Sequence, residues 1–139
     1  MSTNSTVGYV KDGKIHSVYV HWDGYVKGGV GEVLLKHYTT QEKVEQLVAL
    51  GDLSSVYTEC TAPIGHTYRT PHSGYSIAYH RDRGDEYRAP RVSICENFGP
   101  ESDVPERQGF SEYIYVFNAG TWYVKAGDDK FIPVSDYKE

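Results

Sequence analysis

The sequence predicts a single α+β domain in which an antiparallel, aromatic-rich sheet carries a short αα unit packed on one face. Three observations predict this class. Segments with period-two alternation occur near both ends of the chain, and segments with helical spacing occupy residues 30–50. The 139 residues also include 13 tyrosines, a residue type favoured in strands. No repeat, linker or change in composition divides residues 1–139, so one domain is expected, with the polar residues 1–5 disordered.

The first two strands are expected over residues 6–10 and 15–22, joined by a two-residue turn. The turn sequence Asp12-Gly13 favours a type I′ hairpin. Alternation in the second strand places two sets of residues on opposite faces, a core set of His16, Val18, Val20 and Trp22 and a second set of Ile15, Ser17, Tyr19 and His21. The second face therefore carries His21 toward the glycine-rich stretch that follows.

Two short helices are expected between residues 30 and 51. In the second, Thr39 as N-cap and Glu42 form a capping box, and Gly51 occupies the C′ position. The buried stripes are Val30, Val33, Leu34, His37 and Tyr38 in the first helix and Val44, Leu47 and Val48 in the second. These stripes would pack both helices on the same sheet face.

The rest of the chain contains two long loops and the strongest strand signals. Residues 58–73 and 98–109 lack periodicity and are expected to be loops. Short strands are expected over residues 74–80 and 91–95. The C-terminal part predicts a three-stranded meander over residues 112–117, 122–126 and 131–134.

Composition and charge restrict the expected partners. A net charge of -5 and a pI near 5.6 argue against a protein that binds nucleic acid through its backbone. No apolar run approaches the ~20 residues of a membrane span, and the N-terminal residues lack a signal-peptide core. Cys60 and Cys95 are too far apart for a metal motif and are expected to be reduced. We therefore expect a cytoplasmic protein without a membrane partner, and self-association stays open.

The stretch from His21 to Gly31 is the strongest candidate site. Its glycines allow positive φ and close approach of a ligand, and the following helix directs its N-terminus at the stretch. The spacing fits neither a Walker P-loop nor a dinucleotide fingerprint. The ligand-binding candidates are His21, Trp22, Asp23, Tyr25, Lys27, Gly28, Gly29 and Gly31. The alternative is a tight connection in which small residues serve packing, Asp23 serves as a cap or turn residue, and Trp22 belongs to the core.

Arg81 and Arg83, on either side of Asp82, form a second candidate cluster. Two guanidinium groups can hold a phosphate or a carboxylate, although an exposed turn with local ion pairs has the same sequence. The spacing of the six histidines predicts no metal site, and no glycine-flanked serine or local Cys–His signature indicates a nucleophile.

Several runs of residues together carry a resemblance to a family. They are His21-Trp22-Asp23-Gly24-Tyr25 with Gly31, Leu34-Leu35 and Tyr38; Glu42-Lys43-Val44 and Leu50-Gly51-Asp52-Leu53-Ser54; Tyr79 with Arg81-Asp82-Arg83-Gly84-Asp85; and Glu112-Tyr113 with Trp122-Tyr123-Val124. From about residue 8 to 124 the chain resembles short accessory proteins carried by tailed bacteriophages and related mobile elements. The resemblance is most specific in the His-Trp-Asp-Gly-Tyr run, and it departs in the loops around residues 58–73 and 97–109. It implies a phage accessory protein that acts in the host cytoplasm, without an implied activity.

We expect a binding protein for a small anionic ligand, foremost a nucleotide, that sequesters a host defence signal. In this hypothesis the glycine loop holds phosphate, Arg81 and Arg83 pair with it, and Trp22 or Tyr25 stacks on a base. No cofactor is expected. Two alternatives stay open, an inhibitor that binds a host protein through a tyrosine-rich surface and a small hydrolase that uses His21 and Asp23 as acid–base groups.

Overall fold

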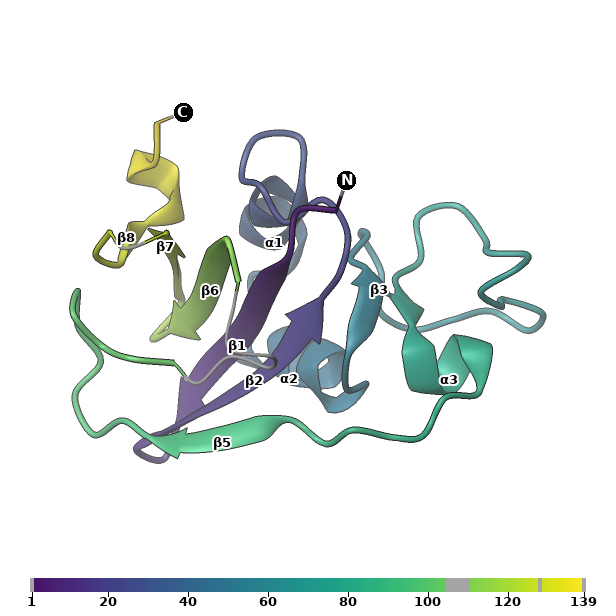
Figure 1. The fold of residues 1–139 in the computed structure, drawn as a ribbon, viewed down its shortest axis with the longest axis horizontal. Helices are drawn as coiled ribbons and strands as arrows, with labels where there is room; N and C mark the ends of the chain where they lie inside the picture. Colours follow the sequence, from purple (N-terminus) through teal and green to yellow (C-terminus); the bar gives the residue numbers. More distant parts are fainter. Residues whose placement is uncertain (1, 105–110, 128, 139) are drawn as a thin grey trace.

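A mixed sheet of eight strands forms the centre of the computed structural model, which describes residues 2–104, 111–127 and 129–138. The strand order is β4-β3-β2-β1-β6-β7-β8, and β5 also pairs with β2 (Figure 1). The predicted α+β class is confirmed. The sheet is mixed rather than purely antiparallel, because β1 pairs with β6, and β2 with β3, in parallel. The strands are β1 (Ser5–Lys11), β2 (Lys14–Val20), β3 (Leu53–Ser55), β4 (Ile77–Ala78), β5 (Arg91–Ile94), β6 (Tyr113–Asn118), β7 (Thr121–Ala126) and β8 (Ile132–Pro133).

The N-terminal hairpin forms as its turn sequence predicts. Asp12 and Gly13 both have positive φ, 53° and 73°, as a type I′ turn requires. The first strand starts earlier than expected, because Ser5 is fully buried within β1. The carbonyl of Asn4 also accepts a hydrogen bond from Glu112 N–H, so the expectation of a disordered segment through residue 5 is wrong at this end of β1.

Two helices, α1 (Val30–His37) and α2 (Gln41–Ala49), pack on one face of the sheet, as predicted. Gly51 has a φ of 84° and ends α2 at the C′ position. The predicted capping box is wrong by one residue. Thr40, not Thr39, is the N-cap, and its side chain accepts a hydrogen bond from Lys43 N–H at 3.2 Å.

The strand predicted over residues 74–80 forms at only two of these residues. Only β4 is extended, and the chain then turns into the one-and-a-half-turn helix α3 (Tyr79–Arg83). The Asp82 carboxylate accepts a hydrogen bond from Ala78 N–H at 2.8 Å, which satisfies a free donor at the start of this helix. Gly84, with a φ of 84°, ends it.

The sheet has a core on each face. The larger core lies under α1 and α2 and contains Tyr38, Tyr115 and Trp122, whose Nε1–H donates to the Tyr38 carbonyl at 2.8 Å. The smaller core, around Ile15, Val116 and Phe131, lies on the other face. The prediction that Trp22 belongs to the core is wrong: β2 ends at Val20, and Trp22 is 40% exposed.

One edge of β2 is shared by two strands, and this arrangement positions the main pocket. β5 pairs with β2 from Lys14 to Ser17, whereas β3 pairs only at Val20. The Tyr19 N–H points into the gap between them, where it donates to the Asp52 carboxylate at 3.1 Å. A side chain therefore replaces a strand partner at this point of the sheet.

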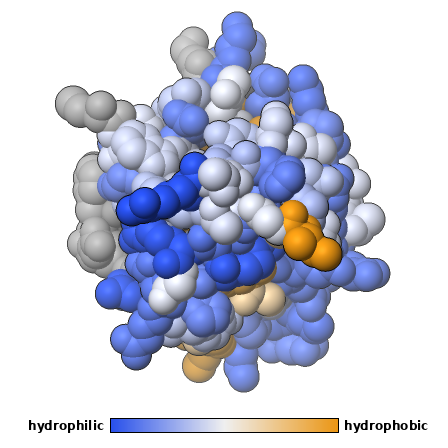
Figure 2. Space-filling view, turned by 90° about the vertical axis from the view of Figure 1, so that its right-hand side faces the viewer, coloured by the Kyte–Doolittle hydropathy of each residue, from blue (hydrophilic) through white to orange (hydrophobic). Residues whose placement is uncertain are grey.

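The face that carries the loop of residues 58–73 and α3 is mostly hydrophilic, with isolated hydrophobic protrusions (Figure 2). None of the helices within the described residues combines the length and apolarity that a membrane crossing requires.

Candidate functional site

The glycine-rich stretch folds into a loop that bonds to the N-terminus of α1. The first N–H groups of the helix donate to loop carbonyls at 2.8–3.3 Å: Gly29 and Glu32 to Val26, Val30 to Asp23, and Gly31 to Tyr25. A free helix N-terminus binds anions through these same groups. In this conformation the loop itself occupies the predicted anion seat.

The glycines of the loop also serve close packing. A Cβ atom on Gly29 would lie 2.5 Å from the carbonyl oxygens of Asp23 and Tyr25, and one on Gly31 would lie 2.9 Å from the Tyr115 ring. Gly29 has an extended φ of -126°, while Gly28 has the positive φ of 75°. These contacts support the alternative in which small residues make a tight connection.

Five of the eight candidates from the loop line two separate hollows. Trp22, Asp23, Gly28 and Gly29 line a hollow of about 50 Å³ beside Tyr57, which is too small for a nucleotide. Lys27 lines a shallow groove of about 440 Å³ beside α1 and the 3₁₀ turn η2 (Val134–Asp136). The Tyr25 hydroxyl donates to the Asp23 carboxylate at 3.1 Å, and this bond raises the pKa of Tyr25.

His21 contacts Tyr19 and Trp22 rather than Asp23. Its Nδ1 lies 2.7 Å from the Tyr19 hydroxyl, and its ring meets the edge of Trp22. Burial, more than any neighbouring charge, raises the pKa of Tyr19, so this hydroxyl keeps its proton. Because His21 bonds to Tyr19 and Asp23 bonds to Tyr25, the acid–base pair of the hydrolase alternative is not formed in this structure.

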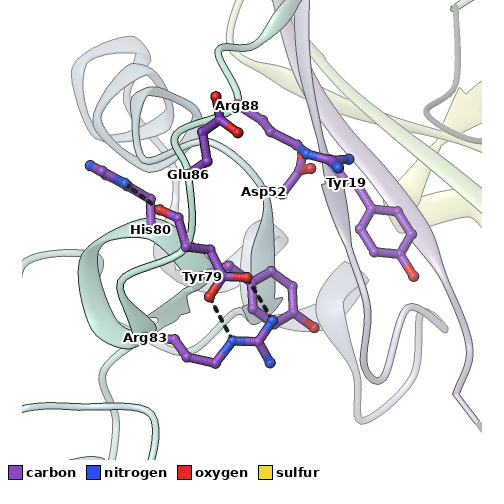
Figure 3. Close-up of a pocket in the computed structure, with 8 residues that line it drawn as sticks. Tyr19, Asp52, Tyr79, His80, Arg83, Glu86 and Arg88 are labelled. Atoms are coloured by element: carbon purple, nitrogen blue, oxygen red, sulfur yellow. Dashed lines mark hydrogen bonds and ion pairs between the residues drawn. The ribbon is translucent and has the colours of Figure 1, made fainter.

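A pocket of about 210 Å³ lies where β3 and β5 diverge along the edge of β2. Figure 3 shows Arg88 on the side of Asp52 and Tyr19, and Arg83 on the side of Tyr79. The other lining residues are His80, Asp85 and Glu86. The pocket thus combines two tyrosine rings, two guanidinium groups, one imidazole and three carboxylates.

Arg83 is held in a fixed position at this pocket. Its Nε and Nη2 donate to the two oxygens of Asp85 at 2.8 and 2.7 Å. Its guanidinium carbon lies 4.4 Å from the Tyr79 ring centroid and 4.9 Å from that of Tyr68. Hydrogen bonds to Arg83 lower the pKa of Asp85, and those to Asp85 raise the pKa of Arg83. Arg88 makes no hydrogen bond and no ion pair within 4.0 Å among the described residues, but its charge also contributes to the lowered pKa of Asp85.

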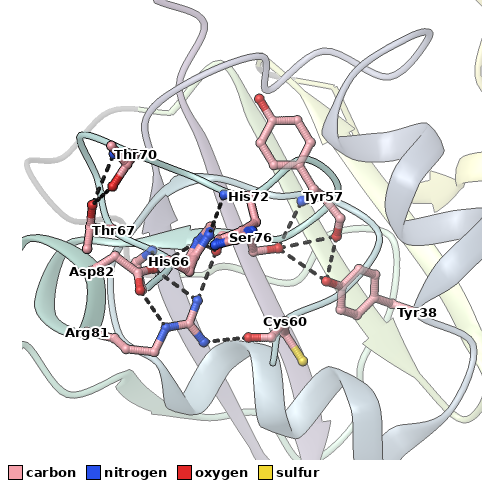
Figure 4. Close-up of polar contacts among 11 residues, drawn as sticks. Tyr38, Tyr57, Cys60, His66, Thr67, Thr70, His72, Ser76, Arg81 and Asp82 are labelled. Atoms are coloured by element: carbon pink, nitrogen blue, oxygen red, sulfur yellow. Dashed lines mark hydrogen bonds and ion pairs between the residues drawn. The ribbon is translucent and has the colours of Figure 1, made fainter. Parts of the chain in front are cut away.

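Arg81 does not reach this pocket, although it stands two residues from Arg83. It donates to both oxygens of Asp82, at 2.8 and 3.0 Å, and to the carbonyls of Ser76 and Cys60 (Figure 4). The Asp82 side chain is 1% exposed, so this ion pair belongs to the interior. Arg81 therefore ties the loop of residues 58–73 to α3, and the two arginines do not share one site.

The same loop is fixed by a buried histidine. His72 N–H donates to His66 Nδ1 at 2.9 Å, which leaves the proton on Nε2 to be donated to the Ser76 carbonyl at 3.1 Å. The Tyr38 hydroxyl donates to the Tyr57 carbonyl at 2.7 Å, and burial raises the pKa of Tyr38. Burial also raises the pKa of Cys60, which argues against a reactive thiolate there.

Most of the pocket residues were not candidates from sequence. Tyr19 belonged to the face that leads to His21, and Asp52 follows the C′ glycine of α2, but nothing in their spacing joins them. Four others, Tyr79, His80, Glu86 and Arg88, lie close to the predicted Arg83 in the sequence. The charged residues from 81 to 88 were therefore the available signal for this part of the pocket. Within the described residues, no group of three or more His, Cys, Asp and Glu side chains is arranged to hold a metal ion.

Comparisons of the chain with protein-family models, with curated proteins and with solved structures gave no match. The site is therefore interpreted from its own residues.

Proposed function

We propose that the protein binds a small anionic ligand, a single nucleotide, in the pocket between β2, β3 and α3. The observation that carries the proposal is the convergence of Arg83, Arg88, Tyr19 and Tyr79 on one hollow of about 210 Å³. Guanidinium groups pair bidentately with phosphate, and tyrosine rings stack on bases. The volume lies below the ~300–1,000 Å³ of sites for drug-sized ligands, which favours a mononucleotide over a dinucleotide.

The carboxylates of the pocket determine which arginine meets the ligand first. Asp85 occupies Arg83, and Asp52 accepts the Tyr19 N–H. Arg88 acts on Asp85 only through its charge and makes no hydrogen bond to it, so it is the primary phosphate contact in this proposal. Arg83 joins when phosphate displaces Asp85, and its stacking on Tyr79 keeps the guanidinium plane in place.

Calorimetric titration with nucleoside monophosphates, diphosphates and cyclic monophosphates tests this proposal. We expect Arg88→Ala to weaken binding about 10- to 100-fold, since a charge-assisted hydrogen bond contributes ~1.5–3 kcal/mol. We expect Asp85→Asn to tighten binding, because it frees Arg83. The matched control is Arg69→Ala, which removes an exposed arginine of the loop that does not line the pocket.

Two results would contradict the proposal. One is the absence of binding to every nucleotide at millimolar concentration, and the other is an unchanged Kd in Arg88→Ala. Conversion of a bound nucleotide, lost in Asp23→Asn, would instead support the hydrolase alternative. In the setting that the phage resemblance implies, binding without turnover would serve to sequester a nucleotide signal of the host.

One observation favours a second candidate, direct binding of a host protein. Ile64 is fully exposed at the tip of the loop of residues 58–73. His66 N–H donates to the Pro63 carbonyl, and Gly65 has a φ of 89°, so Ile64 sits in a tight turn anchored by buried His66. A preorganised turn that presents one apolar side chain suits insertion into a partner's pocket. This candidate predicts that Ile64→Asp, and not Arg88→Ala, abolishes binding of the host protein.

A further inference from the structure

The outer edge of β5 is an open border of the sheet. β5 pairs with β2 alone, and it runs along the lower margin of the molecule with no other described segment beyond it (Figure 1). The Cys95 N–H donates to the Gly13 carbonyl, so Ser93 and Arg91 form the next hydrogen-bonded pairs with β2. By alternation, the N–H and C=O groups of Val92 and Ile94 point outward.

The side chains on this border are apolar and uncovered. Val92 is 55% exposed and Ile94 is 80% exposed, and both lie on the same face of the strand. In Figure 2, hydrophobic atoms are visible at the lower margin of the molecule, the margin that β5 follows in Figure 1. Free backbone groups and exposed apolar side chains therefore coincide on one strand.

The other ends of the sheet carry features that discourage pairing. β8 consists of two residues and includes Pro133, which has no N–H to donate. β4 also has two residues and continues directly into α3. Native proteins protect sheet edges with short strands, proline, lysine or bulges. β5, with four residues, is longer than β4 and β8, and between Arg91 and Ile94 it has no proline, no lysine and no bulge against β2.

We propose that β5 is a self-association edge, where a second copy of this chain adds its own β5 in antiparallel orientation. With a twofold axis through Ser93, Val92 of each copy forms a hydrogen-bonded pair with Ile94 of the other. The twofold keeps Val92 and Ile94 of both copies on one face, where they form a shared apolar patch.

Charge favours a second copy in this orientation. Arg91 is the first residue of β5 and Arg88 precedes it, whereas Glu96 follows the strand closely. An antiparallel twofold places the basic side of one strand beside the acidic side of the other, at both ends of the interface. A four-residue strand buries little area, so the dimer is expected to be weak and to depend on concentration.

Sedimentation equilibrium of the full chain, from micromolar to millimolar concentration, tests the proposal. We expect a reversible monomer–dimer equilibrium whose dissociation constant rises at least tenfold in Ile94→Lys, because the two lysines would lie near one another across the axis. The matched control is Ile64→Lys, the same change at a fully exposed isoleucine outside β5, which should leave the equilibrium unchanged.

Amide hydrogen exchange identifies the interface. Exchange at Val92 and Ile94 should slow as concentration rises, while Ser93, already bonded to β2, should not change. Val92→Pro, which removes an outward N–H, should also weaken the dimer. A chain that stays monomeric at millimolar concentration would overturn the proposal. So would a dimer that Ile64→Lys weakens as much as Ile94→Lys does, or one without slowed exchange at Val92 and Ile94.

Discussion

Arg81 and Arg83 are the same residue type, two positions apart on α3, yet their environments differ. The Arg81 guanidinium bonds to a carboxylate that is 1% exposed and to the carbonyls of Cys60 and Ser76. The Arg83 guanidinium lies at the surface between two tyrosine rings and a half-exposed Asp85. Interior ion pairs are costly to break on one side only, whereas surface pairs contribute little.

Arg81→Ala should therefore lower the free energy of unfolding by about 2–3 kcal/mol, because it leaves the Asp82 carboxylate buried without its cation. Arg83→Ala, as the matched variant, should lower it by about 0–1 kcal/mol. Urea denaturation followed by circular dichroism measures both. Equal losses in the two variants would show that Arg81 is not the residue that fixes the loop.

At the scale of elements, the start of α2 shows how a correct pattern can select the wrong residue. Thr39 and Thr40 offer the same hydroxyl, and Glu42 made Thr39 the better match to a capping box. The structure uses Thr40, whose oxygen accepts the Lys43 N–H.

Thr40→Ala should cost about 1 kcal/mol of stability, because the Lys43 N–H loses its acceptor. Thr39→Ala, one position earlier, should change stability by less than ~0.5 kcal/mol. Thermal denaturation of the two variants side by side makes this comparison. A larger loss for Thr39→Ala would restore the capping box that the sequence suggested.

At the scale of the whole molecule, several carboxylates stabilise the fold in the charged form. A hydrogen bond from Gly28 N–H, together with Lys36, lowers the pKa of Glu32, and the Gln41 amide with Lys11 lowers the pKa of Glu45. Arg83 does the same for Asp85. A group whose pKa is lowered on folding stabilises the protein above its unfolded pKa, and this contribution is lost as pH falls through the folded pKa.

We therefore expect the free energy of unfolding to be steady near neutral pH and to fall as pH drops below about 4.5, the ordinary pKa of Glu. Urea denaturation at a series of pH values measures the slope, and Glu45→Gln should make it shallower. These groups are partly exposed to solvent, so 1 M salt should weaken the effect. A slope that stays unchanged in Glu45→Gln would exclude this carboxylate as a contributor.

Features set by neighbouring residues were predictable from the sequence, and features set by distant pairing were not. The type I′ hairpin follows from Asp12-Gly13 alone, and the end of α2 follows from the glycine at position 51, where the structure has a positive φ. The pocket, in contrast, exists because β3 and β5 reach the same edge of β2 from far along the chain. Sequence patterns describe which face a residue occupies, but they do not specify which strand lies beside it.

The parallel pairing of β1 with β6 has a consequence for synthesis on the ribosome. β1 lies at the middle of the sheet, but its β6 partner emerges about a hundred residues later. At ~5–20 residues per second, the nascent hairpin must wait roughly 5–20 s with one side of β1 unpaired. During this interval the N–H and C=O groups of Thr6 and Gly8, which face β6 in the folded sheet, stay without their strand partner, and slow codons between β2 and β6 would lengthen the exposure.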